Sequence, residues 1–235
     1  MNESRFNIAI ETSSREGSVS LGRGDTLLET FEFGSNRRHA VDMLPRIDEM
    51  CRKYEAKPGD IEEVYVSVGP GSFTGLRVGV TTAKMLARAV GSRIVAVPTL
   101  EVVACNAPDD VDNVVVCLNA KKGKMFTGVF HRQDSGWNAI VEPSLMTPED
   151  VCDRTGPDSF VLIGDSLPDF EWPSRIQNLD PSLATPSSRF VWQVGRRMAD
   201  SDTFTESVKL VPLYVRLPEA EEVWRKKQAE LQAAN

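Results

Sequence analysis

The sequence predicts an α/β protein built from two halves, each of which begins with a meander of short strands. Residues 6–33 read as three strands joined by tight turns. Residues 64–97 follow the order strand, helix, strand, which favours parallel pairing. A second group of short apolar segments comes after a polar, turn-prone stretch at 107–112, which we take as the boundary between the halves.

The boundaries of the lobes follow from these segments. We expect an N-terminal lobe at 1–107 and a C-terminal lobe at 108–217. Residues 218–235 are predicted to form a charged helical tail, with Trp224 and Leu231 as its few apolar anchors. This tail could pack back on the N-terminal lobe.

The composition is that of a folded, acidic protein. The 235 residues include 27 Lys and Arg and 34 Asp and Glu, so the net charge is −7. Such a balance disfavours a stand-alone nucleic-acid binder, although it is compatible with an acidic subunit whose partner supplies a basic surface. The sequence shows no secretory signal, no apolar stretch of membrane-spanning length and four widely separated cysteines. We therefore expect a cytoplasmic protein with reduced thiols and no membrane association.

The first lobe opens with three strand-like segments. Phe6 to Ile10 is a short apolar run, Gly17 to Gly22 alternates apolar and polar residues, and Thr26 to Phe33 continues this pattern. Polar residues at 12–14 and a turn signal at 22–25 separate the three segments. Strands this closely joined indicate an antiparallel meander.

A helix is predicted from about His39 to Tyr54. Its apolar positions recur in steps of three and four, which places them in one wide stripe. Pro45 lies near its start, where proline is tolerated because early N–H groups have no partner. The stripe comprises Ala40, Leu44, Ile47, Cys51 and Tyr54, with Met43 and Met50 alongside.

The rest of the first lobe alternates strands and helices. Strands are predicted at 64–68 and 93–97, with a helix at 76–90 between them. Pro98 and Thr99 open another helix, which extends to about Asn106.

The second lobe is predicted from weaker patterns. Thr147 is expected to cap a helix whose first turn is acidic. Residues 165–189 are rich in Pro, Asp and Ser and read as a long connection, followed by a helix at 187–200. Strands are predicted at 114–118, 125–130, about 139–141 and 160–163.

The glycine-rich segment between the strand at 64–68 and the following helix is the most informative motif. Its glycines at 69, 71 and 75 permit close backbone approach, and a helix start offers free N–H groups to an anion. Phosphate contact and a tight structural turn capped by Thr74 are equally compatible with this spacing. The segment is neither a Walker A loop nor a nucleophile elbow. Gly71, Ser72 and Thr74 are the candidates for contact with a phosphate or nucleotide.

A second candidate phosphate contact lies at the end of the first strand. Glu11, Thr12 and Ser13 place an acid and two hydroxyls at a hairpin tip, which could hold phosphate or could simply be a solvated turn. The lysine-rich turn at 119–124 and the lone His39 are weaker candidates. No acid–base pair, activated nucleophile or metal-binding spacing is recognisable, so no catalytic residue and no metal ligand is assigned.

Five stretches carry a resemblance to a known family. They are Ile8 to Ser13, Arg38-His39 with Leu44-Pro45, Val68 to Gly79, Val97 to Leu100, and Val211 to Ala220. The run from Gly69 to Gly75, followed by Arg77 and Gly79, is the most specific of them. Together they resemble the bacterial TsaB family, also called YeaZ, over nearly the whole chain and most strongly in residues 6–105.

The resemblance implies the actin-like ATPase and sugar-kinase fold, a ribonuclease H-like α/β fold of two lobes, each with a mixed sheet flanked by helices. It also implies a role in making N6-threonylcarbamoyladenosine next to the anticodon of ANN-decoding tRNAs. In that family the TsaD subunit is the transferase, TsaB is its partner, and the ATPase TsaE joins the complex. Contact with tRNA is expected only through the complex. We therefore expect a non-catalytic subunit without a cofactor of its own, and ATP and a metal in the partner subunits.

Two departures from the family pattern weaken a claim to ATP hydrolysis. Family members usually carry Asp at the positions of Glu11 and Asn119. In active kinases of the superfold, those acids help to hold Mg²⁺ and phosphate.

The resemblance also leads to a hypothesis about pairing. The helices at 39–54 and 76–90 are expected to pack against the same two helices of a TsaD-like partner, or of a second copy when the partner is missing. On this hypothesis the small residues Gly75 and Gly79 let a partner helix approach, and Gly79→Trp or Met85→Glu abolishes co-purification without unfolding the chain. The expected interface residues are His39, Met43, Met50, Gly75, Val78, Gly79, Thr82 and Met85.

Two alternative functions are set against this one. A stand-alone small-molecule kinase or ATPase of the same superfold would need a full phosphate-binding set and a glycine-rich adenosine loop in the second lobe, where only single glycines occur. A peptidase would need a metal pair or a nucleophile with a base, and neither is recognisable.

Overall fold

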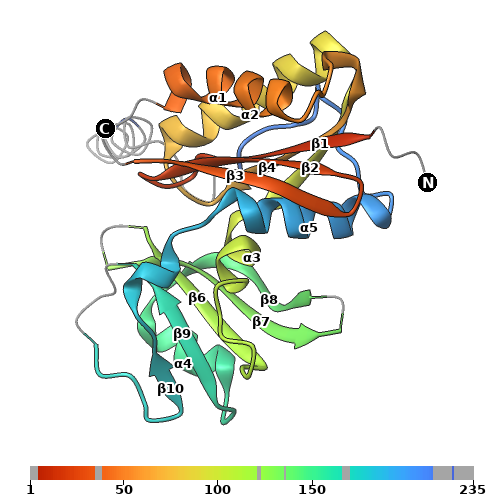
Figure 1. Ribbon diagram of the computed structural model, residues 1–235. Coiled ribbons are helices and arrows are strands. Elements are labelled where there is room, and N and C mark those ends of the chain that lie inside the picture. Colours follow the sequence, from red (N-terminus) through yellow and green to blue (C-terminus); the bar gives the residue numbers. More distant parts are fainter. Residues whose placement is uncertain are drawn as a thin grey trace.

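The structure is a computed structural model that describes residues 5–34, 39–120, 123–134, 136–165, 170–213 and 224, with the side chains of residues 39 and 40 excepted. Two lobes lie one above the other, each built on its own five-stranded sheet (Figure 1). Among the described residues, no helix is both long and apolar enough to span a bilayer.

The first sheet combines an antiparallel meander with two parallel strands. Strands β1 and β2 and strands β2 and β3 pair antiparallel, whereas β4 pairs parallel with both β1 and β5. The strand order is β3-β2-β1-β4-β5, so the predicted meander and βαβ unit share the central strand β1. The strands are β1 (Phe6–Glu11), β2 (Gly17–Arg23), β3 (Thr26–Phe33), β4 (Ile61–Gly69) and β5 (Arg93–Pro98).

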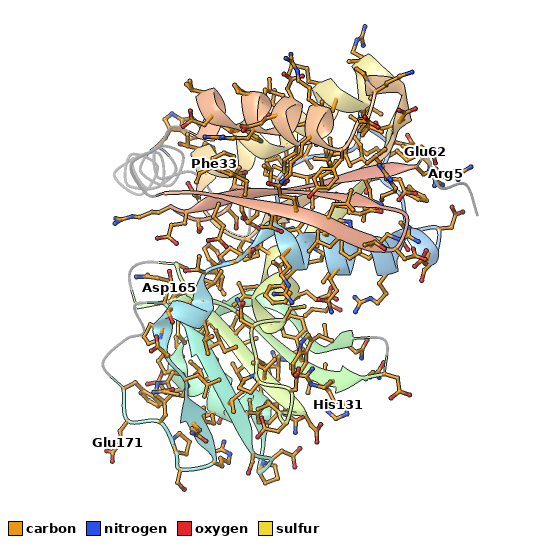
Figure 2. All side chains as sticks on the ribbon, in the orientation of Figure 1. Arg5, Phe33, Glu62, His131, Asp165 and Glu171 are labelled. Atoms are coloured by element: carbon orange, nitrogen blue, oxygen red, sulfur yellow. The ribbon has the colours of Figure 1, made fainter. Side chains whose placement is uncertain are left out.

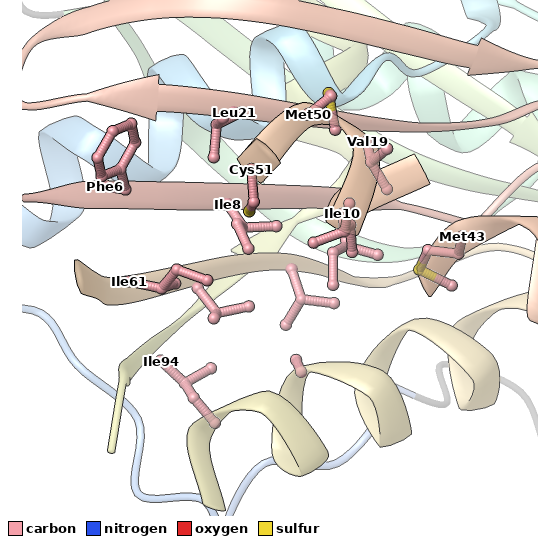
Figure 3. Packing of buried hydrophobic residues seen from close by; sticks show 14 of the residues in the cluster. Phe6, Ile8, Ile10, Val19, Leu21, Met43, Met50, Cys51, Ile61 and Ile94 are labelled. Atoms are coloured by element: carbon pink, nitrogen blue, oxygen red, sulfur yellow. The ribbon is translucent and has the colours of Figure 1, made fainter. Parts of the chain in front are cut away.

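Helices α1 (His39–Lys53) and α2 (Phe73–Val90) cover one face of this sheet (Figure 1). A short 3₁₀ turn, η1 (Pro58–Asp60), leads from α1 into β4. Alternate residues of the central strands, such as Ile8 and Val64, point toward the two helices and are fully buried. Figure 3 shows this cluster between the sheet and the helices.

The opposite face of the same sheet is covered by α3 (Thr99–Ala104) and α5 (Ser188–Asp200) (Figure 1). Here the other alternate residues, Ala9 and Tyr65, pack against Val191 and Val194 of α5. Gly195 is required at this contact because a Cβ there would lie 2.5 Å from Cγ of Tyr65.

The second sheet repeats the topology of the first. Its order is β10-β9-β6-β7-β8, with an antiparallel meander β6-β7-β8 and parallel strands β9 and β10 on the other side of β6. Thr147 is the N-cap of helix α4 (Pro148–Thr155), as predicted, and its side chain accepts a hydrogen bond from the amide of Asp150. The strands are β6 (Asn113–Asn119), β7 (Met125–Gln133), β8 (Gly136–Met146), β9 (Phe160–Gly164) and β10 (Ile176–Asn178).

The predicted class of two α/β lobes is thus confirmed, with two differences. The stretch 165–189 contains β10 and a 3₁₀ turn, η2 (Pro181–Ala184), both too short to show a period in the sequence. The helix at 188–200 packs on the first sheet, although the predicted boundary placed it in the second lobe. Its apolar stripe reveals that it is buried but not which sheet covers it.

The segment after α5 also runs along the first lobe. The amide of Thr205 donates to the carbonyl oxygen of Ile94 on the edge strand β5. The amide of Leu213 donates to the carbonyl oxygen of Val68 at the end of β4. Between them Leu210 is buried in the first-lobe core. The predicted tail at 218–235 lies outside the described residues except for Trp224, which is helical and 60% exposed.

Candidate functional site

The glycine-rich turn between β4 and α2 packs against the turn that follows β1. The amide of Ser72 donates to the carbonyl oxygen of Ser13 at 2.6 Å. The hydroxyl of Thr12 donates to the carbonyl oxygen of Gly75 at 2.8 Å. These two hydrogen bonds hold the start of α2 on the first hairpin of the chain.

The glycines of α2 make room for this hairpin. A Cβ at Gly75 would lie 1.9 Å from the carbonyl oxygen of Thr12, and one at Gly79 would lie 2.4 Å from the Thr12 hydroxyl. A Cβ at Gly71 would lie 2.5 Å from the carbonyl oxygen of Ser13. The prediction that Gly75 and Gly79 admit a partner helix is therefore wrong, because both glycines are buried against the chain's own β1–β2 turn.

Ser72, rather than Thr74, is the N-cap of α2. Its side chain accepts a hydrogen bond from the amide of Gly75, and the helix ends 18 residues later before Gly91, which adopts a left-handed φ of 80°. The side chain of Thr74 is exposed.

The six predicted phosphate contacts fall into two groups. Glu11, Thr12 and Ser13 are buried, with Glu11 and Thr12 fully inaccessible. Gly71, Ser72 and Thr74 are exposed. A ligand at the helix start can therefore reach only the second group, with the acid lying beneath it.

The Glu11 carboxyl lies in an uncharged environment. Its Oε1 accepts the amide of Ser13 at 2.5 Å, while its Oε2 makes no hydrogen bond of standard geometry. Burial raises the pKa of Glu11, and hydrogen bonds to Ser13, Ser67 and Thr12 oppose that rise only in part.

The outward face of α1 differs from the prediction. Met43 and Met50 were expected there, but they are 1% and 4% exposed and pack in the first-lobe core (Figure 3). Val41 and Leu44 occupy the outer face instead, at 63% and 39% exposure. The sequence stripe is broad, and the sheet covers the side of it that contains the methionines.

The outward face of α2 agrees with the prediction in part. Met85 is 48% exposed and Val78 is half-buried, whereas Thr82 turns inward and is buried. Val41, Leu44, Val78 and Met85 are hereafter called the docking face. Helices α1 and α2 contact each other and lie on the same side of the sheet, so these residues belong to one side of the molecule (Figure 1).

Charged residues lie on the same two helices as the docking face. On α1, Arg46 pairs with Glu49 and Arg52 pairs with Asp48, each pair one helical turn apart. At the start of α2 the guanidinium of Arg77 lies 3.8 Å from the ring centroid of Phe73. Exposed ion pairs add little stability, but exposed apolar residues with charged residues nearby are typical of a protein–protein interface.

The remaining candidate residues lie elsewhere or outside the described part. The side chain of His39 and the residues Lys121 and Lys122 are outside it. The amide of Asn119 donates to the carboxylate of Asp165 at 2.6 Å. Sequence reasoning missed Asp165, whose only signal is an acid directly after the glycine that ends β9. It lies at the end of the second lobe nearest the first lobe, whereas His131 lies farther from the first lobe, on the other side of the second (Figure 2).

The thiols are spread through the interior. Burial raises the pKa of Cys105 and of Cys117 to about 12, so both are protonated at neutral pH. All four cysteines are free, and no three His, Cys, Asp or Glu side chains gather in a metal-binding arrangement within the described ranges.

Comparison with known sequences points to one family. The family model described as TsaD, tRNA N6-adenosine threonylcarbamoyltransferase, matches residues 34–222. The TsaB protein of Bacillus subtilis is 30% identical over 57% of this chain and 58% of its own length, and that of Escherichia coli is 28% identical over 63% and 64%. The chain thus matches less than two thirds of the length of these two relatives. The TsaB protein of Haemophilus influenzae is 22% identical over 93% and 95%.

Solved structures agree on the fold. YeaZ from Pseudomonas aeruginosa superposes with a TM-score of 0.78 at 21% identity, over 89% of this chain and 99% of that one. A second Pseudomonas aeruginosa structure, described as similar to peptidase YEAZ, gives 0.79 over 90% and 100%. The two mixed sheets flanked by helices are those of the actin-like fold expected from the sequence. From the family match and these relatives, the chain belongs to the TsaB (YeaZ) family, which shares a sequence model with the TsaD threonylcarbamoyltransferases.

Proposed function

We propose that this chain is a non-catalytic partner subunit in tRNA threonylcarbamoyladenosine biosynthesis. It supports a TsaD-like transferase that attaches a threonylcarbamoyl group to N6 of the adenosine next to the anticodon in ANN-decoding tRNAs. The chain acts in the cytoplasm and meets tRNA only through the complex, because its net charge of −7 opposes direct binding to phosphates.

The docking face is the observation that carries this proposal. Val41, Leu44 and Met85 expose large apolar side chains on two adjacent helices, and two ion pairs lie on the first of these helices. A TsaD-like subunit matches the same family model, and we infer that its equivalent helices make a pseudo-symmetric contact with this face. The same face could pair with a second copy when the transferase is absent.

The arrangement at the α2 start supports a role without chemistry. Glu11, at the position where the family usually has an acid, is fully buried, and Asn119 stands where the family usually has a second acid. ATP, the metal and the TsaE-like ATPase are accordingly assigned to the partner side of the complex. ATP turnover by the purified chain alone would favour the kinase or ATPase alternative.

Co-purification with the TsaD-like subunit tests the docking face. Val41→Glu and Met85→Glu place a charge at exposed positions, so the chain stays folded while a dry contact becomes unfavourable by several kcal/mol. We expect both variants to lose the partner. Ile140→Glu is the matched control, because Ile140 is 52% exposed on β8 of the second lobe.

The outcomes separate clearly. Folded docking-face variants that still bind the transferase would contradict the proposed surface.

Depletion of the chain followed by nucleoside analysis of tRNA tests the pathway itself, and unchanged threonylcarbamoyladenosine in a cell without a second gene copy would contradict the function. Gly79→Trp is unsuitable as a test variant, since the structure leaves no room for any side chain there.

A further inference from the structure

Glu11 is a buried acid whose surroundings contain no charge to balance it. Its side chain is 0% exposed. The groups that act on the carboxyl are Thr12 and Ser13 from the following turn and Ser67 from β4, and Ser18 lies opposite it on β2. All of these residues are uncharged.

Three buried polar atoms at this point lie near one another without meeting standard hydrogen-bond geometry. Oε2 of Glu11 and the hydroxyls of Ser13 and Ser67 are buried without a hydrogen bond of standard geometry. An ionised carboxylate buried among uncharged groups is costly, whereas a neutral acid has an O–H that can donate to a serine hydroxyl. The neutral acid is therefore the form that satisfies this cluster at lower cost.

The Glu11 carboxyl contacts the turn whose residues Thr12 and Ser13 hydrogen-bond to the start of α2. Oε1 accepts the amide of Ser13, the carbonyl of Ser13 accepts the amide of Ser72, and the neighbouring Thr12 donates to Gly75. The two residues that follow Glu11 therefore connect it to Ser72, the N-cap of α2, and to Gly75 in the first turn of the helix that carries Val78 and Met85.

We propose that Glu11, in its uncharged form, is a positioning residue that fixes the start of α2 and thereby the docking face. Ionisation of the carboxyl draws water or a cation toward the buried cluster and loosens the β1–β2 turn from the helix. The link to partner binding rests on the proposed function, whereas the link from Glu11 to α2 concerns this chain alone.

Infrared spectroscopy of the purified chain tests the uncharged state. The difference spectrum between wild type and Glu11→Gln at about pH 7 is expected to contain the carbonyl band of a protonated carboxylic acid. Glu63→Gln serves as the control, because Glu63 is also buried but pairs with Arg93 and Arg196. A carboxylate band in the Glu11 difference spectrum at that pH would overturn the proposal.

Amide hydrogen exchange tests the positioning role without any partner. Gln keeps the shape of the side chain and a donor, so Glu11→Gln is expected to retain the protection of amides 75–79. Glu11→Ala is expected to lose about tenfold or more of it. The amide of Val115, a buried residue of β6 in the second lobe, is the internal reference. Equal protection of amides 75–79 in Gln and Ala variants, relative to Val115, would overturn the role.

Binding of the TsaD-like subunit tests the consequence for docking. We expect Glu11→Gln to bind like the wild type, and Glu11→Ala to bind at least about tenfold more weakly. If the alanine variant binds as tightly as wild type, the docking consequence is wrong. If even the wild type does not bind, the proposed function has failed, and the exchange experiment still decides the role of Glu11.

Discussion

The carbonyl oxygen of Thr12 lies 1.9 Å from the position that a Cβ on Gly75 would occupy. The first turn of α2 therefore sits directly on the backbone of the β1–β2 turn, a contact that only glycine permits. This contact gives the glycine-rich turn a structural purpose. It holds in a protein whose Glu11 side chain is fully buried and so cannot reach a ligand at the helix start.

Gly75→Ala should destabilise the chain by about 2 kcal/mol or more, since overpacking outweighs the gain of up to about 1 kcal/mol from better helix propensity. Urea unfolding measures the difference. Gly59→Ala is the control, because nothing lies within 4 Å of a Cβ there. Equal midpoints for the two variants would show that the contact relaxes freely.

Met43 and Leu44 are neighbours in α1 that should respond differently to truncation. Met43→Ala leaves a cavity in the first-lobe core and is expected to cost about 2–5 kcal/mol. Leu44→Ala removes a side chain that is 39% exposed and should cost less than about 1 kcal/mol. Thermal unfolding of both variants decides whether the methionine faces inward, and the reverse ranking would contradict the structure.

Stability should depend on pH through Glu11. Its folded-state pKa is raised by burial, so the neutral form stabilises the fold fully below the unfolded pKa. This stabilisation is lost as the pH rises through the folded pKa. Between the unfolded and the folded pKa, wild type should lose about 1.4 kcal/mol of stability per pH unit relative to Glu11→Gln, and above the folded pKa the difference should stay constant, as measured by unfolding at a series of pH values. Parallel profiles for the two proteins would show that Glu11 does not titrate between the states.

The thiol of Cys117 should resist alkylation in the folded protein. It is fully buried with a pKa of about 12, so the reactive thiolate is a fraction of about 10⁻⁵ at pH 7. Mass spectrometry after brief iodoacetamide treatment should find it unmodified until urea unfolds the chain. Labelling of Cys117 at the same rate with and without urea would contradict its burial.

Gly195→Ala should weaken the packing of α5 on the first sheet. The new Cβ would lie 2.5 Å from Cγ of the buried Tyr65, which predicts a loss of about 1–3 kcal/mol. Gln193→Ala, at an exposed position of the same helix, should stay within about 0.5 kcal/mol of wild type. Similar unfolding midpoints for both would mean that α5 shifts without cost.

Local patterns in the sequence were sufficient for the strands and helices of the first lobe. Alternation at 17–22 and the three-and-four spacing of α1 are properties of single elements, so they predict type and extent before any neighbour is known. The motif from Gly69 to Gly79 likewise carried the family resemblance, because its glycines are needed at fixed positions in one turn and one helix.

Only the tertiary structure decided which way those elements face. The α1 stripe includes Met43, Leu44 and Met50, and the sheet buries both methionines while leaving the leucine exposed. Helix α5 lies on the first sheet although it follows the second sheet in the chain. The carboxyl of Glu11 lies near Ser67 of the distant strand β4 as well as near its chain neighbours Thr12 and Ser13. Facing and burial depend on contacts between distant segments, which periodicity within one segment does not encode.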